Sequence, residues 1–177
     1  MQPLVAPAAD QRIARWLAWG YELKTRELLG SGAFGTVYKM RTTKAKYGLR
    51  EGSWVAVKEL NDGTARFDPV YGALAKPDAD KEKDPFLQLN SRDEFVKLID
   101  SHKDERSGFS ALMFELCEGG SLSALLALPK PVFSNDDLII AALRLLRALH
   151  HLRGVRLVHR DIAPRNVFLR CVGDFSS

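Results

Sequence analysis

The chain has 177 residues, of which 46% are hydrophobic and 27% are charged, so it contains enough apolar material for one ordinary globular domain and is not a disordered protein. Its net charge of +4 is too small an excess to indicate nucleic-acid binding, and its positive residues are scattered without an aromatic stacking platform. Cys117 and Cys171 form no CxxC pair and no cluster with histidine, which argues against a disulfide framework or a zinc site.

The first two-thirds of the chain is predicted to be mostly β-structure. A short amphipathic helix is expected after Asp10, because Ile13, Trp16 and Leu17 follow at helical spacing. Residues 61–92 contain three prolines that disfavour helix in the residue before each of them, so any helix there must be short. Strands are predicted at 21–29, 35–42, 53–60, 94–99 and 111–116.

The pattern becomes helical after the glycine-containing break at 118–120, which ends the predicted sheet. A short helix is expected at 121–128, and Ser134 with two nearby aspartates begins a long helix that runs to about Leu152. This long helix is apolar on nearly all sides, which is typical of a helix inside a larger core. We therefore expect the chain alone to be marginally stable, to aggregate, or to rely on a partner that covers this helix.

A glycine-rich motif lies between the first two predicted strands. Residues 30–37 read GSGAFGTV and match G-x-G-x-x-G-x-V. Glycines let backbone N–H groups approach phosphate oxygens and allow positive φ. Three glycines alone are a weak signal, but residues 36–39 are strand-like, whereas a dinucleotide-binding fold would begin a helix there. The motif therefore predicts a hairpin that covers nucleotide phosphates.

The third predicted strand contains the segment VAVK at 55–58. An ammonium at this point can reach the α- and β-phosphates of a nucleotide held under the glycine hairpin. Taken alone, Lys58 is more simply explained as an exposed strand lysine, since most lysines are solvated.

The third motif, at 159–166, reads HRDIAPRN and matches H-R-D-L-x-x-x-N. By composition, such a match arises by chance in about one chain in a thousand, and the required order of all three motifs lowers that about a hundredfold. From residue 28 to 175 the chain resembles the protein kinases. The resemblance implies an α+β, protein-kinase-like fold with bound ATP and Mg²⁺. It divides the chain into an N-terminal helical extension at 1–20, a small antiparallel β-sheet N-lobe with the hinge at 21–117, and a truncated helical C-lobe at 118–177.

The resemblance also implies roles for individual residues. Asp161 would be the catalytic base, Lys58 the phosphate-binding lysine, and Asn166 a magnesium ligand. His159 and Arg160 would be structural. By the same resemblance, the ATP-binding residues would be Gly30, Gly32, Gly35, Val37, Ala56, Lys58, Glu115 and Cys117. Glu115 and Cys117 would bind ATP through their backbones, and Phe114 would close the rear of the pocket.

Two further positions carry alternatives. Glu82 is the nearest candidate for the glutamate that pairs with Lys58, but Pro85 follows closely and a solvated charge run is the other interpretation. Asp174 begins D-F-S, which resembles the magnesium-binding D-F-G, and it is equally well explained without a function. The short spacing from Asn166 would require a tight turn at 170–171.

The sequence leaves alternatives for the residue type that accepts the phosphoryl group and for whether the chain is active. Arg165, four residues after Asp161, resembles tyrosine kinases, and Ala163 stands where serine/threonine kinases usually carry lysine. The resemblance therefore leans towards a tyrosine kinase or a tyrosine-kinase-like relative, with Arg165 in the catalytic set. The function expected is transfer of the ATP γ-phosphoryl group to a protein hydroxyl, on tyrosine or on serine/threonine. The alternative is an inactive nucleotide-binding or scaffold pseudokinase fragment.

The sequence also predicts where the chain resides. It shows no secretion signal and no window of about 18 uncharged apolar residues. We expect a cytoplasmic chain with no membrane segment, no nucleic-acid partner and a protein substrate that the sequence does not identify.

Overall fold

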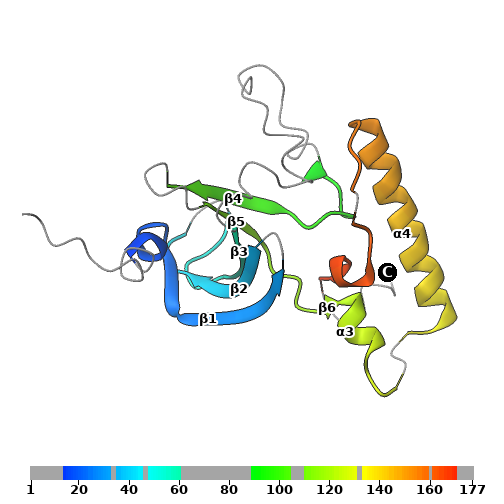
Figure 1. Ribbon diagram of the computed structural model, residues 1–177, viewed down its shortest axis with the longest axis horizontal. Coiled ribbons are helices and arrows are strands. Elements are labelled where there is room, and N and C mark those ends of the chain that lie inside the picture. The colour runs from blue at the N-terminus through cyan, green and yellow to red at the C-terminus, as the bar shows by residue number, and fades with distance from the viewer. Residues whose placement is uncertain are drawn as a thin grey trace, which may run out of the picture. The chain divides into compact units, whose positions relative to one another are not determined.

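The computed structural model describes residues 14–32, 35–45, 48–60, 89–104, 110–130, 133–159 and 161–170. These residues fall into two compact units, one formed by 14–60 with 99–115 and the other by 89–98 with 116–170, each with the gaps just given. The first unit contains a five-stranded sheet, and the second contains two α-helices and a two-stranded sheet (Figure 1).

The sheet of the first unit has the strand order β1-β2-β3-β5-β4. The pairs β1–β2, β2–β3 and β3–β5 are antiparallel. The predicted bounds of β2 are confirmed residue for residue, and the bounds of β3 and β5 differ from the predicted ones by at most one residue. β1 runs three residues further than predicted, because the glycines continue the strand. The strands are β1 (Tyr21–Gly32), β2 (Gly35–Thr42), β3 (Trp54–Leu60), β4 (Leu98–Lys103) and β5 (Ser110–Glu115).

Side chains connect the two edge strands of this sheet. The Tyr21 hydroxyl on β1 and Nε2 of His102 on β4 lie 2.8 Å apart and share a hydrogen bond. Trp19 stacks on the His102 ring with centroids 4.7 Å apart, and Arg15 forms an ion pair with Asp104. The segment that precedes β1 therefore bridges the two edges of the sheet.

The core of the first unit lies on one face of this sheet. Residues 14–18 are helical, as predicted for the described part of that helix. Trp16 is 1% exposed, whereas its neighbour Leu17 is 53% exposed and does not join the core. Of the described residues on the expected apolar face, Trp16 is therefore buried and Leu17 is not. The buried cluster consists of Trp16, Tyr21, Met40, Val55, Val57, Ala111 and Met113.

The prediction of a strand at 94–99 is wrong, because β4 begins only at Leu98. The Asn90 side chain makes two hydrogen bonds to the Leu98 backbone, donating to its carbonyl at 2.7 Å and accepting from its N–H at 3.0 Å. Arg170 donates to the carbonyls of Asp93 and Phe95. The polar groups of this stretch are therefore used in a turn rather than in a sheet ladder.

The second unit contains the predicted helices α3 (Leu122–Leu126) and α4 (Asn135–Gly154). Each begins at a serine: Ser121 accepts from the Ala124 N–H, and Ser134 forms a capping box with Asp137. These hydrogen bonds from Ser134 hold the pKa of Asp137 below its ordinary value. No helix in the described ranges combines the length and apolarity needed to cross a bilayer.

The remaining elements of the second unit join α3 to the segment that follows α4. A 3₁₀ turn, η2 (Pro164–Asn166), precedes β7 (Phe168–Leu169). β7 pairs antiparallel with β6 (Gly120–Ser121). The five-stranded sheet therefore ends where the sequence predicted, but the glycine break itself belongs to a second small sheet that the sequence analysis did not predict.

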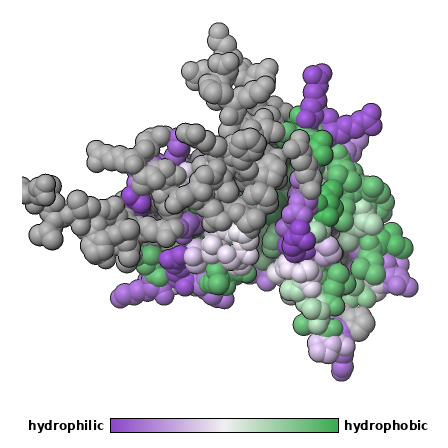
Figure 2. All heavy atoms as spheres, viewed as in Figure 1, coloured by the Kyte–Doolittle hydropathy of each residue, from purple (hydrophilic) through white to green (hydrophobic). Residues whose placement is uncertain are grey.

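Helix α4 exposes most of its apolar side chains. Among its residues, only Ala141 and Leu152 are buried. Figure 2 shows a largely hydrophobic surface over this helix. In the described part of the chain, the apolar side chains predicted on nearly all sides of this helix are therefore mostly left exposed. The exposed members are Leu138, Ile139, Leu143, Leu146 and Leu149, between 40% and 61% accessible.

Candidate functional site

The glycine-rich motif forms the β1–β2 hairpin, as predicted. Gly30 pairs with Val37, and Gly32 pairs with Gly35, on either side of residues 33–34, which lie outside the described ranges. Ser31 and Thr36 hydroxyls lie 3.2 Å apart across the hairpin. The motif therefore forms the ends of two paired strands and does not begin a helix.

The three glycines meet different surroundings. Gly35 has φ of +148°, and a Cβ built there would lie 2.2 Å from the carbonyl oxygen of Glu59 on β3. Packing against β3 therefore requires a glycine at this position. A Cβ at Gly30 or Gly32 would meet no described atom within 4 Å. Packing against the described residues does not explain these two glycines, whereas close approach of a ligand to the backbone would.

Three predicted ATP-binding side chains lie on one face of the sheet. In antiparallel pairs, directly opposite residues point to the same face. Val37 is opposite Lys58, and Lys58 is opposite Leu112. Ala56 lies two residues from Lys58 and is opposite Phe114. This face is defined by Val37, Ala56, Lys58, Leu112 and Phe114, and we call it the nucleotide face after the role predicted from the sequence. It lies opposite the buried core of Val55 and Val57.

The predicted hinge residues Glu115 and Cys117 lie at the end of β5 and just after it. Glu115 is the last residue of β5, and both Glu115 and Cys117 are half-buried. The Cys117 carbonyl accepts a hydrogen bond from the Gly120 N–H at 3.2 Å. That carbonyl is therefore partly used in the turn that leads into β6.

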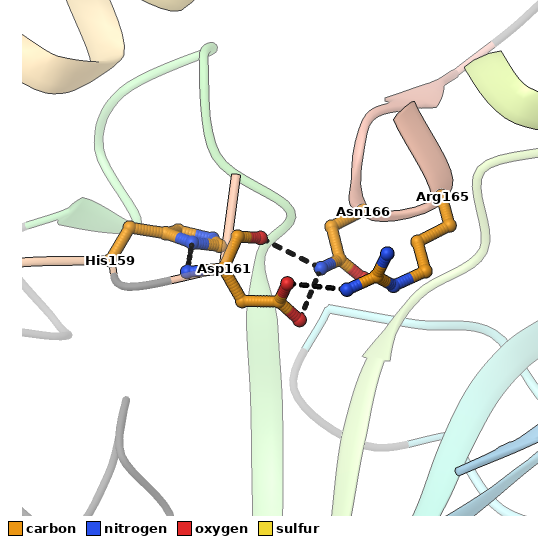
Figure 3. Close-up of polar contacts among 4 residues, drawn as sticks. All are labelled: His159, Asp161, Arg165 and Asn166. Atoms are coloured by element: carbon orange, nitrogen blue, oxygen red, sulfur yellow. Dashed lines mark hydrogen bonds and ion pairs between the residues drawn. The ribbon is translucent and has the colours of Figure 1, made fainter. Parts of the chain in front are cut away.

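The segment 161–166, which ends with η2, brings Asp161, Arg165 and Asn166 together (Figure 3). Arg165 donates from Nη2 to Oδ1 of Asp161 at 2.5 Å. The Asn166 amide nitrogen donates to Oδ2 of Asp161 at 2.9 Å and to its backbone carbonyl at 2.8 Å. The Asp161 side chain is still 45% exposed. The carboxylate is thus oriented from both oxygens and remains accessible to an incoming hydroxyl group.

Local backbone bonds explain why this loop has a defined shape. The Asp161 N–H donates to Nδ1 of His159 at 3.3 Å, which supports the structural role expected of that histidine. Within η2, the Asn166 N–H donates to the Ala163 carbonyl at 2.9 Å. The Val167 carbonyl accepts from the Leu122 N–H at 2.8 Å, which ties the loop to the beginning of α3.

The chemistry of Asn166 fits a magnesium ligand. Its amide nitrogen is occupied by Asp161, so its oxygen is the atom left to face an ion, and Mg²⁺ prefers oxygen ligands. In the part of the chain that the structure describes, no three His, Cys, Asp or Glu side chains form a metal cluster. Arg160, Glu82 and Asp174 lie outside the described residues, as does the turn expected at 170–171 beyond Arg170.

Sequence reasoning did not single out Leu112. This half of the nucleotide face comes from β5, more than fifty residues after β3, and only the β3–β5 register places Leu112 beside Lys58. No local motif signals such a pairing. An apolar residue in a predicted strand was the only available clue.

The chain matches a known protein family. The family model described as protein tyrosine and serine/threonine kinase matches residues 23–175. This span includes the glycine hairpin, Lys58 and the loop that carries Asp161.

Comparison with known proteins gives relatives of the same kind. The chain is 32% identical over 156 residues to inhibitor of nuclear factor kappa-B kinase subunit epsilon of Mus musculus, covering 87% of this chain and 20% of that protein. It is 30% identical to MAP kinase kinase kinase SSK2 of Saccharomyces cerevisiae, covering 81% of this chain and 8% of that protein. It is 29% identical to serine/threonine-protein kinase Nek11 of Homo sapiens, covering 85% and 22%. The chain thus spans less than a quarter of the length of each of these relatives, and by its family match it belongs to the protein kinases.

Proposed function

We propose that this chain binds Mg-ATP and transfers the γ-phosphoryl group to a protein hydroxyl. The observation that carries the proposal is the accessible Asp161 carboxylate, oriented by Arg165 and Asn166. In the reaction, the acceptor oxygen forms a bond to the γ-phosphorus, the bond from that phosphorus to the bridging oxygen of ADP breaks, and Asp161 accepts the hydroxyl proton.

The nucleotide is proposed to bind the first unit on its nucleotide face. Val37 and Ala56 would contact the adenine, and the backbones of Glu115 and Cys117 would bond its edge. Lys58 would neutralise the α- and β-phosphates under the glycine hairpin. The open space beside Gly30 and Gly32 supports this role.

Magnesium is proposed to bind through the Asn166 amide oxygen, with Asp174 as a second ligand. When bound, the ion would neutralise phosphate charge. Glu82 remains the proposed partner of Lys58. The domain division remains the one expected from the sequence, with an N-lobe and hinge at 21–117 and a C-lobe at 118–177.

Replacing Lys58 with alanine is expected to weaken Mg-ATP binding about 10- to 100-fold, since a hydrogen bond to a charged group contributes roughly 1.5 to 3 kcal/mol. Binding of a fluorescent ATP analogue to the 177-residue chain measures the change. Lys24→Ala, at an exposed position on β1, is the matched control and should leave the Kd unchanged. Equal affinities for wild type and Lys58→Ala would contradict the assignment.

The acceptor is proposed to be serine or threonine. Nek11 is named a serine/threonine-protein kinase, as are other relatives, among them SSK22 of Saccharomyces cerevisiae. Arg165 favours tyrosine by resemblance, but in the structure its guanidinium is engaged with Asp161. Transfer to a degenerate peptide library containing only tyrosine acceptors would overturn the proposal. A cytoplasmic location also remains part of the proposal.

A partner surface on α4 is also proposed. Each exposed apolar side chain of this helix would gain about 1.5 to 3 kcal/mol from burial, so further polypeptide is expected to cover it. The chain alone should therefore associate with itself.

Replacing Leu143 with lysine is expected to shift the chain towards monomer, because the substitution places a charge on the apolar surface of α4. Sedimentation velocity over a range of concentrations measures the shift. Leu17→Lys is the matched control, since both leucines are 53% exposed and Leu17 lies in the other unit. A wild-type chain that is monomeric at all concentrations and unfolds cooperatively on heating would contradict the expectation.

A further inference from the structure

Arg170, the residue directly after β7, is bonded through both its side chain and its backbone. Its guanidinium donates to the Asp93 carbonyl at 2.6 Å and to the Phe95 carbonyl at 2.9 Å. Its own carbonyl accepts from the Glu118 N–H at 3.0 Å. One residue therefore joins two segments that are far apart in the sequence.

These two segments are the described places where the chain passes between the two units. The first passage lies between Leu98 and Ile99, three residues after Phe95. The second lies between Glu115 and Leu116, and Glu118 follows it closely. Both segments lead directly to strands of the sheet that carries Lys58: one into β4, the other out of β5.

The first segment is itself a closed turn. The two bonds between the Asn90 side chain and the Leu98 backbone fix its ends. Nη1 and Nη2 of Arg170 reach carbonyls two residues apart, which suits the planar fork of a guanidinium and not the single ammonium of lysine. The turn is thus held as a unit at the point where β4 begins.

Arg170 is also close in sequence to the catalytic loop. It follows Asn166 by four residues, and β7 between them pairs with β6. The adjacent Leu169 carbonyl accepts from the Gly119 N–H at 2.9 Å. A displacement at Arg170 would therefore be passed through β7 to Asn166 and to the carboxylate of Asp161 that Asn166 orients.

We infer that Arg170 is a positioning residue for phosphoryl transfer. Its bonds hold the catalytic loop in register with both chain segments that lead to the nucleotide-binding sheet. This inference rests on the proposed function, because the position of the catalytic loop affects a rate only if the chain transfers phosphate. A displacement of about 1 Å in a reacting group can lower a rate about a hundredfold.

The test compares Arg170→Met and Arg170→Lys with the control Arg153→Met, which replaces an exposed arginine in the last turn of α4. In the full chain, Arg170→Met is expected to lower kcat about 10- to 100-fold while the Kd for a fluorescent ATP analogue changes less than about twofold. Arg170→Lys should behave in the same way, since it keeps the charge and loses the fork. Arg153→Met should change neither quantity.

Amide hydrogen exchange separates this inference from the proposed function, because it requires no activity. Arg170→Met should increase exchange at the Leu98, Glu118 and Val167 amides, which are bonded in the wild-type chain. Increased exchange together with an inactive wild-type chain would refute the proposed function, but it would still show that Arg170 holds the two segments. Unchanged exchange in both Arg170 variants, or a fall in kcat matched by an equal weakening of ATP binding, would overturn the inference.

Discussion

Replacing Asp161 with asparagine is expected to lower phosphoryl transfer about 100- to 10,000-fold, the range that a positioned general base contributes. Asparagine has nearly the same shape, so it can still accept the hydrogen bond from Arg165 at Oδ1. It cannot take up the acceptor's proton. ATP binding, which the proposal assigns mainly to the nucleotide face of the first unit, should change less than about twofold.

The measurement is transfer of labelled γ-phosphate to a peptide mixture, alongside equilibrium binding of the ATP analogue. Asp136→Asn, in the first turn of α4, removes a carboxylate from the same unit and should leave both quantities unchanged. Undiminished transfer by Asp161→Asn would refute the role of the base. A wild-type chain that binds Mg-ATP but transfers nothing would instead establish the inactive, nucleotide-binding alternative.

Sequence reasoning succeeded where a few neighbouring residues determine the structure. The glycine motif predicts the β1–β2 hairpin because strand-like residues follow Gly35 at once. Ser134 and Asp137 predict the start of α4 because both partners of the capping box lie within one turn. The contacts among Asp161, Arg165 and Asn166 likewise span only five residues. In each case the partners are close enough in sequence to be recognised as a motif.

Sequence reasoning failed where residues that are distant in the sequence determine the structure. Residues 94–97 have the composition of a strand, but Arg170, more than seventy residues later, binds the Phe95 carbonyl in this stretch and the Asp93 carbonyl just before it. The β6–β7 pairing joins segments almost fifty residues apart, and nothing local marks either partner. A hydrogen bond from a single side chain leaves no periodic signal, so the sequence offers no pattern from which to read it.

Trp16 presents an intermediate case, which bears on how the first unit is stabilised. Helical spacing predicts an apolar stripe that includes Trp16 and Leu17, but it does not say which side chain is buried. Tertiary contacts decide this, because Trp16 packs against the rings of Trp19 and Tyr21 and is buried, whereas Leu17 is left in solvent. The segment before β1 is therefore part of the core of the sheet unit.

Replacing Trp16 with alanine is expected to destabilise the first unit by about 3 to 5 kcal/mol, the usual cost of removing a buried tryptophan. Trp16 is 1% exposed, and its ring packs edge-on against Trp19 and Tyr21 with centroids 5.5 Å apart in each pair. Such a loss is a large fraction of the roughly 5 to 15 kcal/mol that stabilises a typical domain. Urea unfolding followed by far-ultraviolet circular dichroism measures the shift in midpoint.

Trp54→Ala provides the matched control for this prediction. Trp54 lies on β3 in the same unit, but it is 39% exposed, and its contacts are with the side chains of Lys39 and Arg41. An exposed cation–π contact contributes about 0.5 to 1 kcal/mol, so this variant should unfold close to the wild-type midpoint. If both tryptophan variants shifted the midpoint equally, the segment before β1 would not be part of the core. The hydrogen bond between Tyr21 and His102 would then have to form without support from that segment.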